Sequence, residues 1–417
     1  MNHGEAREAS RMLASMGCQV TGPYRVSEDA RPEAAMIFTC DVISSTENHM
    51  WRRIDELYSS CGKVIVAGCL AALAGQELRM RFPGVHLIDS MGLPSLRSSI
   101  ERMFEPCTGG SSSGLQRIQT TRIDTIVPVS TGCAGNCSYC ITKLARGRIR
   151  SYPVETVLEA VRRGVGSGRI EILLTSQDTA AYGMDGRDEN IGSLLRAITD
   201  GITGNYRIRV GMMNPVLAGR IMDHILEGYD NVRVFRFFHI PVQSGSDPIL
   251  RRMGRGYSVD DFRSMVAKIR DRFPMATIST DLIAGFPGET EEDHVRSMEL
   301  LRWLRPDILN ITRFSRRPET AANMMTDQVK GAVIKDRSRE MTAIHSEMQA
   351  DILERRLGHH PSCLVTEVGK GRTMMARDVN YTPIVIEAGR EILGRSVDID
   401  TSETGPSYLK GGRDWKP

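Results

Sequence analysis

Strand-like and helix-like segments alternate through the middle of this 417-residue chain, and the alternation limits the folds open to it. Repeated β/α units of this kind form parallel sheets that are covered by helices. The expected strands are 124–128, 170–175, 207–212, 233–240, 277–283 and 307–312. The expected helices are 154–164, 191–200, 217–228, 259–273, 290–304 and 332–356. We therefore predict an α/β fold with a partial parallel (β/α)6 barrel, whose site lies at the C-terminal ends of the strands.

Two further units flank this region. Before it, the Gly- and Ser-rich run 109–114 is the clearest flexible linker. The segment that precedes the linker has apolar runs at 36–39 and 64–67 between helix-like stretches, which predicts a small Rossmann-like α/β domain. After residue 356, short strand-like runs between Gly-rich and Asp/Asn turns predict a small β-barrel. The expected domains are 1–108, 119–356 and 357–417.

Composition narrows the class of protein without defining its function. Hydrophobic residues make up 41% and charged residues 25%, as in ordinary globular proteins. No run of about 18 apolar residues occurs, so we expect no membrane span. Met1 is followed by a polar, helix-like segment, so we expect no signal peptide. A formal net charge of +3 is too small to indicate nucleic acid by itself. Nine cysteines in a chain of this size favour thiols in a reducing cytoplasm over disulfides. We also expect the protein to be a monomer.

The most specific motif is a cysteine loop after the first barrel strand. Cys133, Cys137 and Cys140 have the spacing C-x3-C-x2-C. Three thiolates from one tight loop can hold three irons of a [4Fe–4S] cluster. The fourth iron then stays open to chelate the methionine part of S-adenosylmethionine. The alternatives are a zinc site or three unrelated core cysteines, but zinc prefers four ligands and the loop holds no fourth Cys or His. The loop therefore predicts radical S-adenosylmethionine chemistry.

The motif and its surroundings resemble the methylthiotransferase family of radical S-adenosylmethionine enzymes. The resemblance extends over nearly the whole chain, in runs at 131–133, 137–140, 150–153, 174–178, 240–246, 281–290 and 314–315. The runs 141–147 and 182–183 are most similar to the archaeal and eukaryotic branch. That branch methylthiolates C2 of threonylcarbamoyladenosine next to the anticodon of tRNA. The resemblance therefore implies a tRNA-modifying enzyme with a barrel of the radical S-adenosylmethionine type.

The resemblance also implies which residues bind S-adenosylmethionine. Most of them end strands, where polar groups face the mouth of a parallel barrel. The implied contacts are Tyr139, Thr175, Gln177, Asp178, Gln243, Ser244 and Gly285. The alternatives are strand-end capping for the polar residues, loop packing for Tyr139, and an acidic helix start for the run around 289–292.

Contacts with RNA are expected in two places. Four cations lie within the eight residues 143–150, just past the cysteine loop, and could attract tRNA phosphates. A solvated charged face is the alternative. The C-terminal unit resembles the TRAM module, which implies a β-barrel that binds RNA backbone and stacks on bases. The candidate RNA-binding residues are Lys143, Arg146, Arg372 and Tyr381.

The resemblance further implies a second [4Fe–4S] cluster in the N-terminal domain, held by three cysteines at strand ends. Cys40 and Cys69 follow the two predicted strands, and neighbouring parallel strands end at one edge of a sheet. The third cysteine would fall just before Met1, so we expect the natural protein to start upstream. The alternative is a genuine two-cysteine N-terminus. For the chain as given we expect about four irons after reconstitution, not about eight.

The sequence leaves three alternatives open. Two are other reactions, the methylthiolation of isopentenyladenosine in tRNA and the methylthiolation of an aspartate in a ribosomal protein. The third is a non-catalytic RNA-binding iron–sulfur protein. The runs of the archaeal and eukaryotic type argue against the first two. The complete cysteine loop and the turns at Gln177 and Gln243 favour an enzyme over the third. The expected partners are tRNA, an electron donor protein and a sulfur donor.

Overall fold

The computed structural model describes residues 2–20, 32–39, 44–88, 92–104, 123–412 and 415. The chain forms two compact units. The first combines the residues up to 121 with 130–135 and 140–150, and the second contains 122–129, 136–139 and 151–417. The predicted linker at 109–114 lies outside the described residues.

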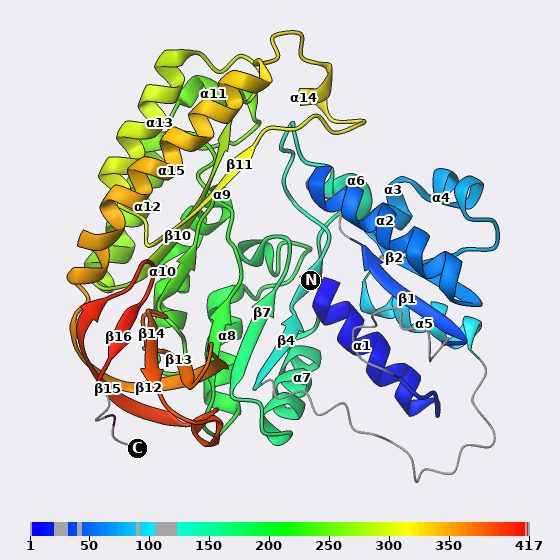
Figure 1. Ribbon diagram of the computed structural model, residues 1–417, viewed down its shortest axis with the longest axis horizontal. Coiled ribbons are helices and arrows are strands. Elements are labelled where there is room, and N and C mark those ends of the chain that lie inside the picture. Colours follow the sequence, from blue (N-terminus) through cyan, green and yellow to red (C-terminus); the bar gives the residue numbers. More distant parts are fainter. Residues whose placement is uncertain are drawn as a thin grey trace. The chain divides into compact units, whose positions relative to one another are not determined.

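The first unit is built on a parallel sheet of β1 (Ala34–Thr39), β2 (Lys63–Gly68) and β3 (His86–Ile88), in the order β1-β2-β3. Both faces of the central strand are buried. Val64 and Val66 pack toward one apolar cluster, and Ile65 and Ala67 pack toward another. The helices of this unit, blue and cyan in Figure 1, are α1 (Asn2–Ser15), α2 (Ser44–Ser60), α3 (Cys69–Leu73), α4 (Gly75–Arg81), α5 (Leu93–Met103) and α6 (Thr142–Arg146). A sheet with helices on both faces confirms the predicted α/β domain.

The second unit contains two parallel three-stranded sheets. One has β4 (Asp124–Pro128), β7 (Glu171–Thr175) and β8 (Arg207–Val210), in that order. The other has β9 (Phe237–His239), β10 (Thr277–Ala284) and β11 (Ile308–Arg313), with β10 in the middle. A parallel bridge between Ile208 and Val234 joins β8 to the segment that leads into β9. The six strands therefore follow one another in chain order, which confirms the predicted partial (β/α)6 barrel.

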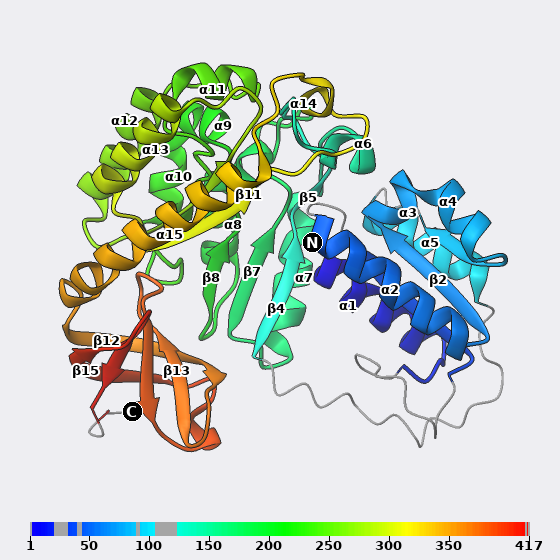
Figure 2. The same cartoon turned by 45° about the horizontal axis from the view of Figure 1, so that its top comes forward.

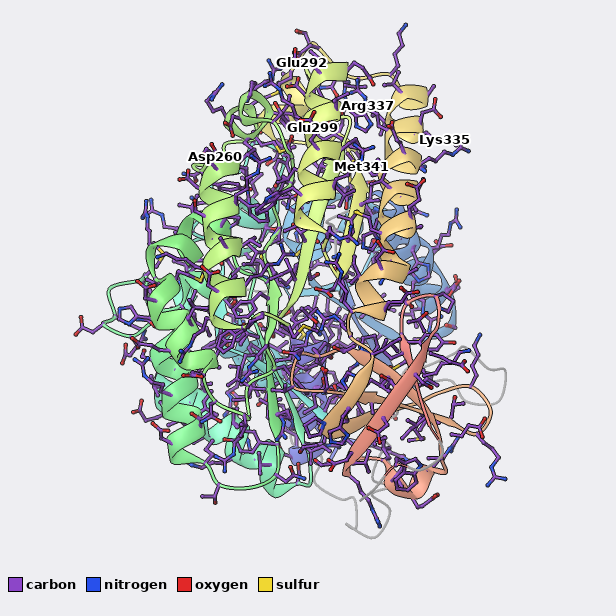
Figure 3. All side chains as sticks on the ribbon, turned by 90° about the vertical axis from the view of Figure 1, so that its left-hand side faces the viewer. Asp260, Glu292, Glu299, Lys335, Arg337 and Met341 are labelled. Atoms are coloured by element: carbon purple, nitrogen blue, oxygen red, sulfur yellow. The ribbon has the colours of Figure 1, made fainter. Side chains whose placement is uncertain are left out.

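Helices cover one face of these strands. The apolar residues on that face, such as Ile172, Ile208 and Ile278, belong to one large core shared with the helices. The described α-helices of this unit are α7 (Val154–Gly166), α8 (Ile191–Gly201), α9 (Pro215–Arg220), α10 (Met222–Tyr229), α11 (Asp247–Arg252), α12 (Val259–Arg272), α13 (Glu291–Leu304), α14 (Ala321–Met324) and α15 (Gly331–Glu354), and α14 packs in a separate small cluster through Ala322. The expected helix 217–228 is thus divided in two at Ile221. Figure 3 looks onto the outer helices, with Asp260 on α12, Glu299 on α13 and Met341 on α15.

The chain ends in a small closed barrel, which confirms the predicted C-terminal β-barrel. Its strands are β12 (Gly358–Val368), β13 (Thr373–Arg377), β14 (Pro383–Glu387), β15 (Ser396–Thr404) and β16 (Leu409–Gly411), in the order β12-β13-β14-β16-β15. Figure 2 shows this barrel in orange and red. It has its own apolar core around Val365, Ile384 and Ile399. Among the described helices, none has the length and apolarity that crossing a membrane would require.

Candidate active site

The cysteine loop is shaped by tight backbone contacts. It follows β5 (Ser130–Thr131) and starts at Gly132, whose φ of 78° favours glycine. A Cβ atom on Gly132 would lie 2.0 Å from the carbonyl oxygen of Arg148. The next residue, Cys133, donates its backbone N–H to the carbonyl of Gly147 at 3.1 Å. The start of the loop is therefore fixed by backbone geometry that leaves no room for another residue type at Gly132.

The middle of the loop is fastened to the turn after α11. Ser138 donates its backbone N–H to Met253 O at 2.9 Å and its hydroxyl to Arg252 O at 2.8 Å. Gly254 has a φ of 71°, and a Cβ atom there would lie 2.9 Å from Asn136 O. Tyr139 packs edge-on against Phe286, with 6.2 Å between the ring centroids. The segment 136–139 is thus held by a turn more than 100 residues later in the chain.

Arg255 is a site residue that sequence reasoning missed. It is buried, and its Nη1 donates to the Sγ of Cys137 at 3.2 Å. Its Nη2 donates to Pro241 O at 3.1 Å, in the turn that follows β9. Burial opposes the charge of the guanidinium, but nearby Tyr257, Tyr139 and Cys137 raise its pKa above the ordinary value. The one sequence signal was an arginine between two glycines, Gly254 and Gly256.

Buried polar atoms end β7. Within the part of the chain that the structure describes, Thr175 Oγ1 and Asp178 Oδ2 are buried and have no hydrogen-bond partner. The other carboxylate oxygen, Asp178 Oδ1, accepts from Asn214 N at 3.0 Å and Ala180 N at 3.1 Å. Burial raises the pKa of Asp178 to about 6. Gln177 is half-buried beside them. Unsatisfied buried polar groups at a strand end are suited to a polar ligand.

The turn after β9 brings the next pair of predicted residues to the same end of the strands. Gln243 has a φ of 72°, which is uncommon for a residue with a side chain. Its N–H donates to Asp281 O at 2.8 Å, and its carbonyl accepts from Ile283 N at 2.9 Å. Ser244 is buried, and its hydroxyl accepts from Ser246 N at 3.2 Å. The backbone around Gln243 is therefore clamped onto β10.

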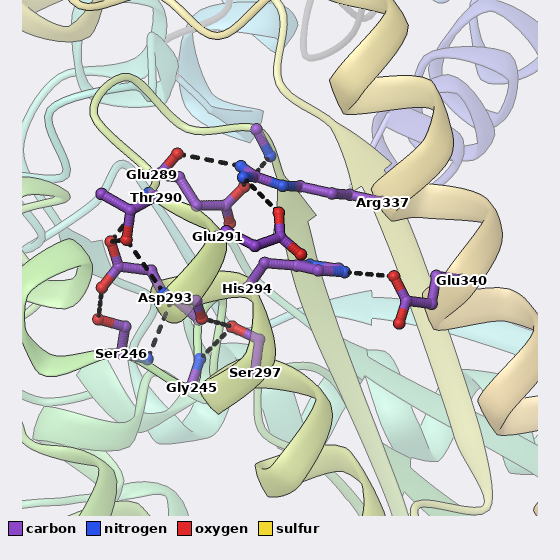
Figure 4. Close-up of polar contacts among 12 residues, drawn as sticks. Gly245, Ser246, Glu289, Thr290, Glu291, Asp293, His294, Ser297, Arg337 and Glu340 are labelled. Atoms are coloured by element: carbon purple, nitrogen blue, oxygen red, sulfur yellow. Dashed lines mark hydrogen bonds and ion pairs between the residues drawn. The ribbon is translucent and has the colours of Figure 1, made fainter.

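Side chains of α13 hold this turn in place, as Figure 4 shows. Asp293 accepts a hydrogen bond from the hydroxyl of Ser246. Ser297 accepts from the backbone N–H of Gly245 at 2.9 Å. The same Asp293 forms a capping box with Thr290, so the start of α13 and the turn after β9 are one network.

A buried ion pair holds the loop after β10. Gly285 has a φ of 76°, and its N–H donates to Glu289 Oε2 at 2.7 Å. Arg337 of α15 contacts the same oxygen at 2.8 Å and also donates to the carbonyl of Glu289 at 3.0 Å (Figure 4). Both side chains are buried. Glu289 therefore stabilises the loop after β10. The sequence alone indicated only an acidic residue at the start of a helix.

The candidate RNA-binding residues differ in exposure. Lys143 is half-buried and Arg372 is exposed. Arg146 is buried and pairs with Glu5 of α1 at 2.7 Å, because α6 turns its guanidinium into the first unit. Tyr381 donates its hydroxyl to Glu171 at 2.9 Å, and its ring packs against Phe235 and Phe237. Arg146 is therefore buried and Tyr381 is half-buried against aromatic rings, whereas Arg372 lies on the surface.

One of the two expected ligands of a second cluster is described. Cys69 is buried at the start of α3, directly after β2. Gly68 precedes it with a φ of 98°, and a Cβ atom there would lie 2.4 Å from Thr39 O. The ends of β1 and β2 therefore lie side by side, as the parallel register of Thr39 with Gly68 requires. Cys40, which follows Thr39, lies outside the described residues.

The cysteine loop fits an iron–sulfur cluster by its donor set. Thiolates are the ligands that such clusters prefer. Among the described residues, no three His, Cys, Asp or Glu side chains are already gathered as a metal group. The fit therefore rests on three thiols within eight residues. The buried guanidinium of Arg255 donates a hydrogen bond to one of these thiols, that of Cys137.

Two family models match parts of this chain. Residues 127–301 match the model of the radical SAM superfamily, and residues 1–89 match the uncharacterized protein family UPF0004. The matched domain makes the chain a radical S-adenosylmethionine protein. A solved structure of the radical S-adenosylmethionine methyltransferase TsrM from Kitasatospora setae shares this fold. Its TM-score is 0.54 at 14% identity, over 71% of this chain and 67% of that one.

Curated relatives define the family more closely. A probable threonylcarbamoyladenosine tRNA methylthiotransferase of Archaeoglobus fulgidus is 37% identical over 94% of this chain and 93% of the relative. The corresponding protein of Pyrococcus abyssi is 33% identical over 98% and 97%. The threonylcarbamoyladenosine tRNA methylthiotransferase of Homo sapiens is 29% identical over 98% of this chain and 72% of its own length. This chain belongs to the family of threonylcarbamoyladenosine tRNA methylthiotransferases, which confirms the resemblance seen in the sequence.

Proposed function

We propose that this protein methylthiolates C2 of threonylcarbamoyladenosine next to the anticodon of tRNA. The observation that carries the proposal is the similarity to relatives of that name over 94% of the chain, together with the three-cysteine loop. The target carbon–hydrogen bond has no acidic proton and no leaving group. When bound, a [4Fe–4S] cluster with S-adenosylmethionine supplies radical chemistry that can act on such a bond.

The residues of the chain would hold and orient these groups. Cys133, Cys137 and Cys140 would hold the cluster, and Arg255 would keep Cys137 in place. The partnerless oxygens of Thr175 and Asp178 are available to polar atoms of S-adenosylmethionine. The backbone-clamped turn at Gln243 and Ser244 and the loop at Gly285 would complete that site, with Gln177 and Tyr139 beside them. Rigid strand ends suit this role because they preorganise the ligand before reaction.

The remaining expectations belong to the same proposal. The chain would have three domains with separate roles, 1–108, 119–356 and 357–417. The first would carry a second cluster on Cys40 and Cys69, and the last would bind RNA through exposed residues such as Arg372. We propose a cytoplasmic monomer that depends on an electron donor protein and a sulfur donor.

An assay with matched tRNAs tests the function. Reconstituted protein is incubated anaerobically with tRNA that carries or lacks the threonylcarbamoyl group, and the nucleosides are analysed by mass spectrometry. We expect the methylthio product only from the threonylcarbamoyl tRNA. Equal activity on both tRNAs, or activity only on isopentenyladenosine, would contradict the proposal.

A cysteine variant tests the chemistry. Cys137→Ala should abolish formation of 5′-deoxyadenosine, because two thiolates cannot hold the cluster in the geometry that leaves one iron open. Cys363→Ala is the matched control, since Cys363 is buried in the core of the C-terminal barrel. Normal cofactor cleavage by the Cys137 variant would remove the basis of the assignment.

A further inference from the structure

Three polar side chains form a row across β9, β10 and β11. His239 Nε2 lies 3.0 Å from Asp281 Oδ1, and Asn310 Nδ2 donates to the same oxygen at 2.7 Å. Asp281 pairs directly with Asn310 in the parallel register, and His239 pairs with Ser279, two residues before Asp281. One carboxylate oxygen therefore holds both neighbours. Since a carboxylate accepts, Asn310 must turn its amide nitrogen toward it.

The row lies on the strand face opposite the helices. Along β10, Ile278, Leu282 and Ala284 belong to the core that packs against α12, α13 and α15 (Figure 1). Because strand side chains alternate, Asp281 points to the other face. Solvent reaches the row, since the side chains of His239 and Asp281 are 21% and 25% exposed and Asn310 is exposed.

The row also lies beside the proposed cofactor site. The carbonyl oxygen of Asp281 accepts from the backbone N–H of Gln243 at 2.8 Å. A ligand on the row would therefore sit next to the turn at Gln243 and Ser244. On the same face, Phe237 lies two residues before His239 on β9. The Arg209 guanidinium lies over the rings of Phe237 at 4.6 Å and Tyr381 at 5.3 Å, so it adds positive charge to this strand face.

The polar atoms of the row are not all used. Among the described residues, the Asn310 side chain bonds only to Asp281, so its carbonyl oxygen and its second N–H remain available. His239 Nδ1 likewise has no hydrogen-bond partner in the described part of the chain. The row thus presents an amide donor, an amide acceptor and an imidazole nitrogen. An aliphatic group placed here would leave these atoms unsatisfied, which is unfavourable.

We infer that Asn310, oriented by Asp281 and His239, is a specificity-determining residue that binds the threonylcarbamoyl substituent of the substrate adenosine. This inference rests on the proposed function. The substituent carries N–H, carbonyl, hydroxyl and carboxylate groups, which match the available atoms of the row and the charge of Arg209. An isopentenyl substituent offers none of these groups. Asp281 and His239 act through Asn310 as positioning residues.

The test compares the full chain with its Asn310→Leu variant, which keeps the side-chain volume and removes the amide. Binding is measured with three anticodon stem-loops that carry threonylcarbamoyladenosine, unmodified adenosine or isopentenyladenosine. Asn205→Ala is the control, because Asn205 is exposed in the loop before β8. We expect the variant to bind the threonylcarbamoyl loop on the order of tenfold more weakly, with unchanged affinity for unmodified adenosine. The control should match the wild type.

Other readouts separate this inference from the function it rests on. Asn310→Leu should raise KM for the threonylcarbamoyl substrate, whereas Asn205→Ala should leave that KM and 5′-deoxyadenosine formation without RNA unchanged. If the wild type modifies threonylcarbamoyladenosine while the variant binds all three loops as the wild type does, the inference is wrong and the function stands. An equal loss of affinity for all three loops would also overturn it, because that result indicates a general structural defect. A wild type that does not act on threonylcarbamoyladenosine would overturn both.

Discussion

Arg255 Nη1 donates a hydrogen bond to the Sγ of Cys137, 3.2 Å away, although 118 residues separate the two in the chain. Through Nη2 the same guanidinium donates to Pro241 O at 3.1 Å. One side chain therefore connects the cysteine loop with the turn after β9. Because Arg255 is buried, this link is shielded from solvent.

Replacing Arg255 should weaken cluster binding. Arg255→Met removes the hydrogen bond to Cys137 and the tie to Pro241 while keeping much of the side-chain volume. We expect less iron per chain after reconstitution and faster loss of the cluster's visible absorbance in the presence of a chelator. Arg251→Met is the control, because Arg251 is exposed in the neighbouring helix α11. Iron content and loss rates equal to the wild type would show that Arg255 does not support the cluster.

The buried carboxyl of Asp178 predicts a pH-dependent stability. Its pKa of about 6 in the folded chain exceeds the ordinary value of 3.8, because burial disfavours the charged form. The folded state therefore binds the proton more tightly than the unfolded state, and Asp178 lowers stability as pH rises from about 4 through about 6. Ionised Asp178 should lower the unfolding free energy by on the order of 3 kcal/mol above that range.

Asp178→Asn removes this effect in the cluster-free chain. We expect a higher unfolding midpoint than the wild type at pH 7.5 and the same midpoint at pH 4. Asp185→Asn is the control, and its effect on stability should be opposite to that of Asp178→Asn. Although partial desolvation acts to raise the pKa of Asp185, hydrogen bonds from Ser151 lower it below the ordinary value. That variant should be less stable than the wild type at pH 7.5. A midpoint of Asp178→Asn that stays at the wild-type value at both pH values would contradict the prediction.

The Glu289–Arg337 pair should contribute strongly to stability. Arg337→Met leaves Glu289 buried without its cation, and breaking a buried pair in this way typically lowers stability by about 3–5 kcal/mol. Urea unfolding measures the loss. Lys335→Met on the same helix is the control, because Lys335 is exposed (Figure 3). The double variant Glu289→Gln with Arg337→Met should recover part of the loss, and equal loss in single and double variants would argue against an electrostatic cause.

The C-terminal barrel should bind tRNA through its exposed cations. We expect Arg372→Glu to weaken tRNA binding at low salt by on the order of tenfold, with a smaller difference at high salt, because phosphate contacts release counterions. Cofactor cleavage without tRNA should be unchanged. Arg302→Glu, the same charge change on the exposed side of α13, is the control. An equal effect of both variants would indicate net charge alone.

Deletion of the barrel is a less suitable experiment, and the structure shows why. Leu364 and Tyr381 of the barrel pack against Phe235 and Phe237, and Arg356 connects Asp307 with Thr382. Removing residues 358–417 would expose these aromatic rings to water. Such a deletion would therefore change stability as well as RNA binding.

The sequence by itself determined the six strands, the cysteine loop and the closed C-terminal barrel. These features depend on neighbouring residues, since apolar runs, glycine turns and cysteine spacing act over short distances along the chain. Only the tertiary structure decided which charged side chains meet. Arg146 lies in a cationic run that predicts an RNA-binding surface, but its side chain is buried against Glu5, which is 141 residues away in the sequence. Arg255 with Cys137 and Asn310 with Asp281 likewise depend on strand register and on the packing of distant turns, which no local pattern encodes.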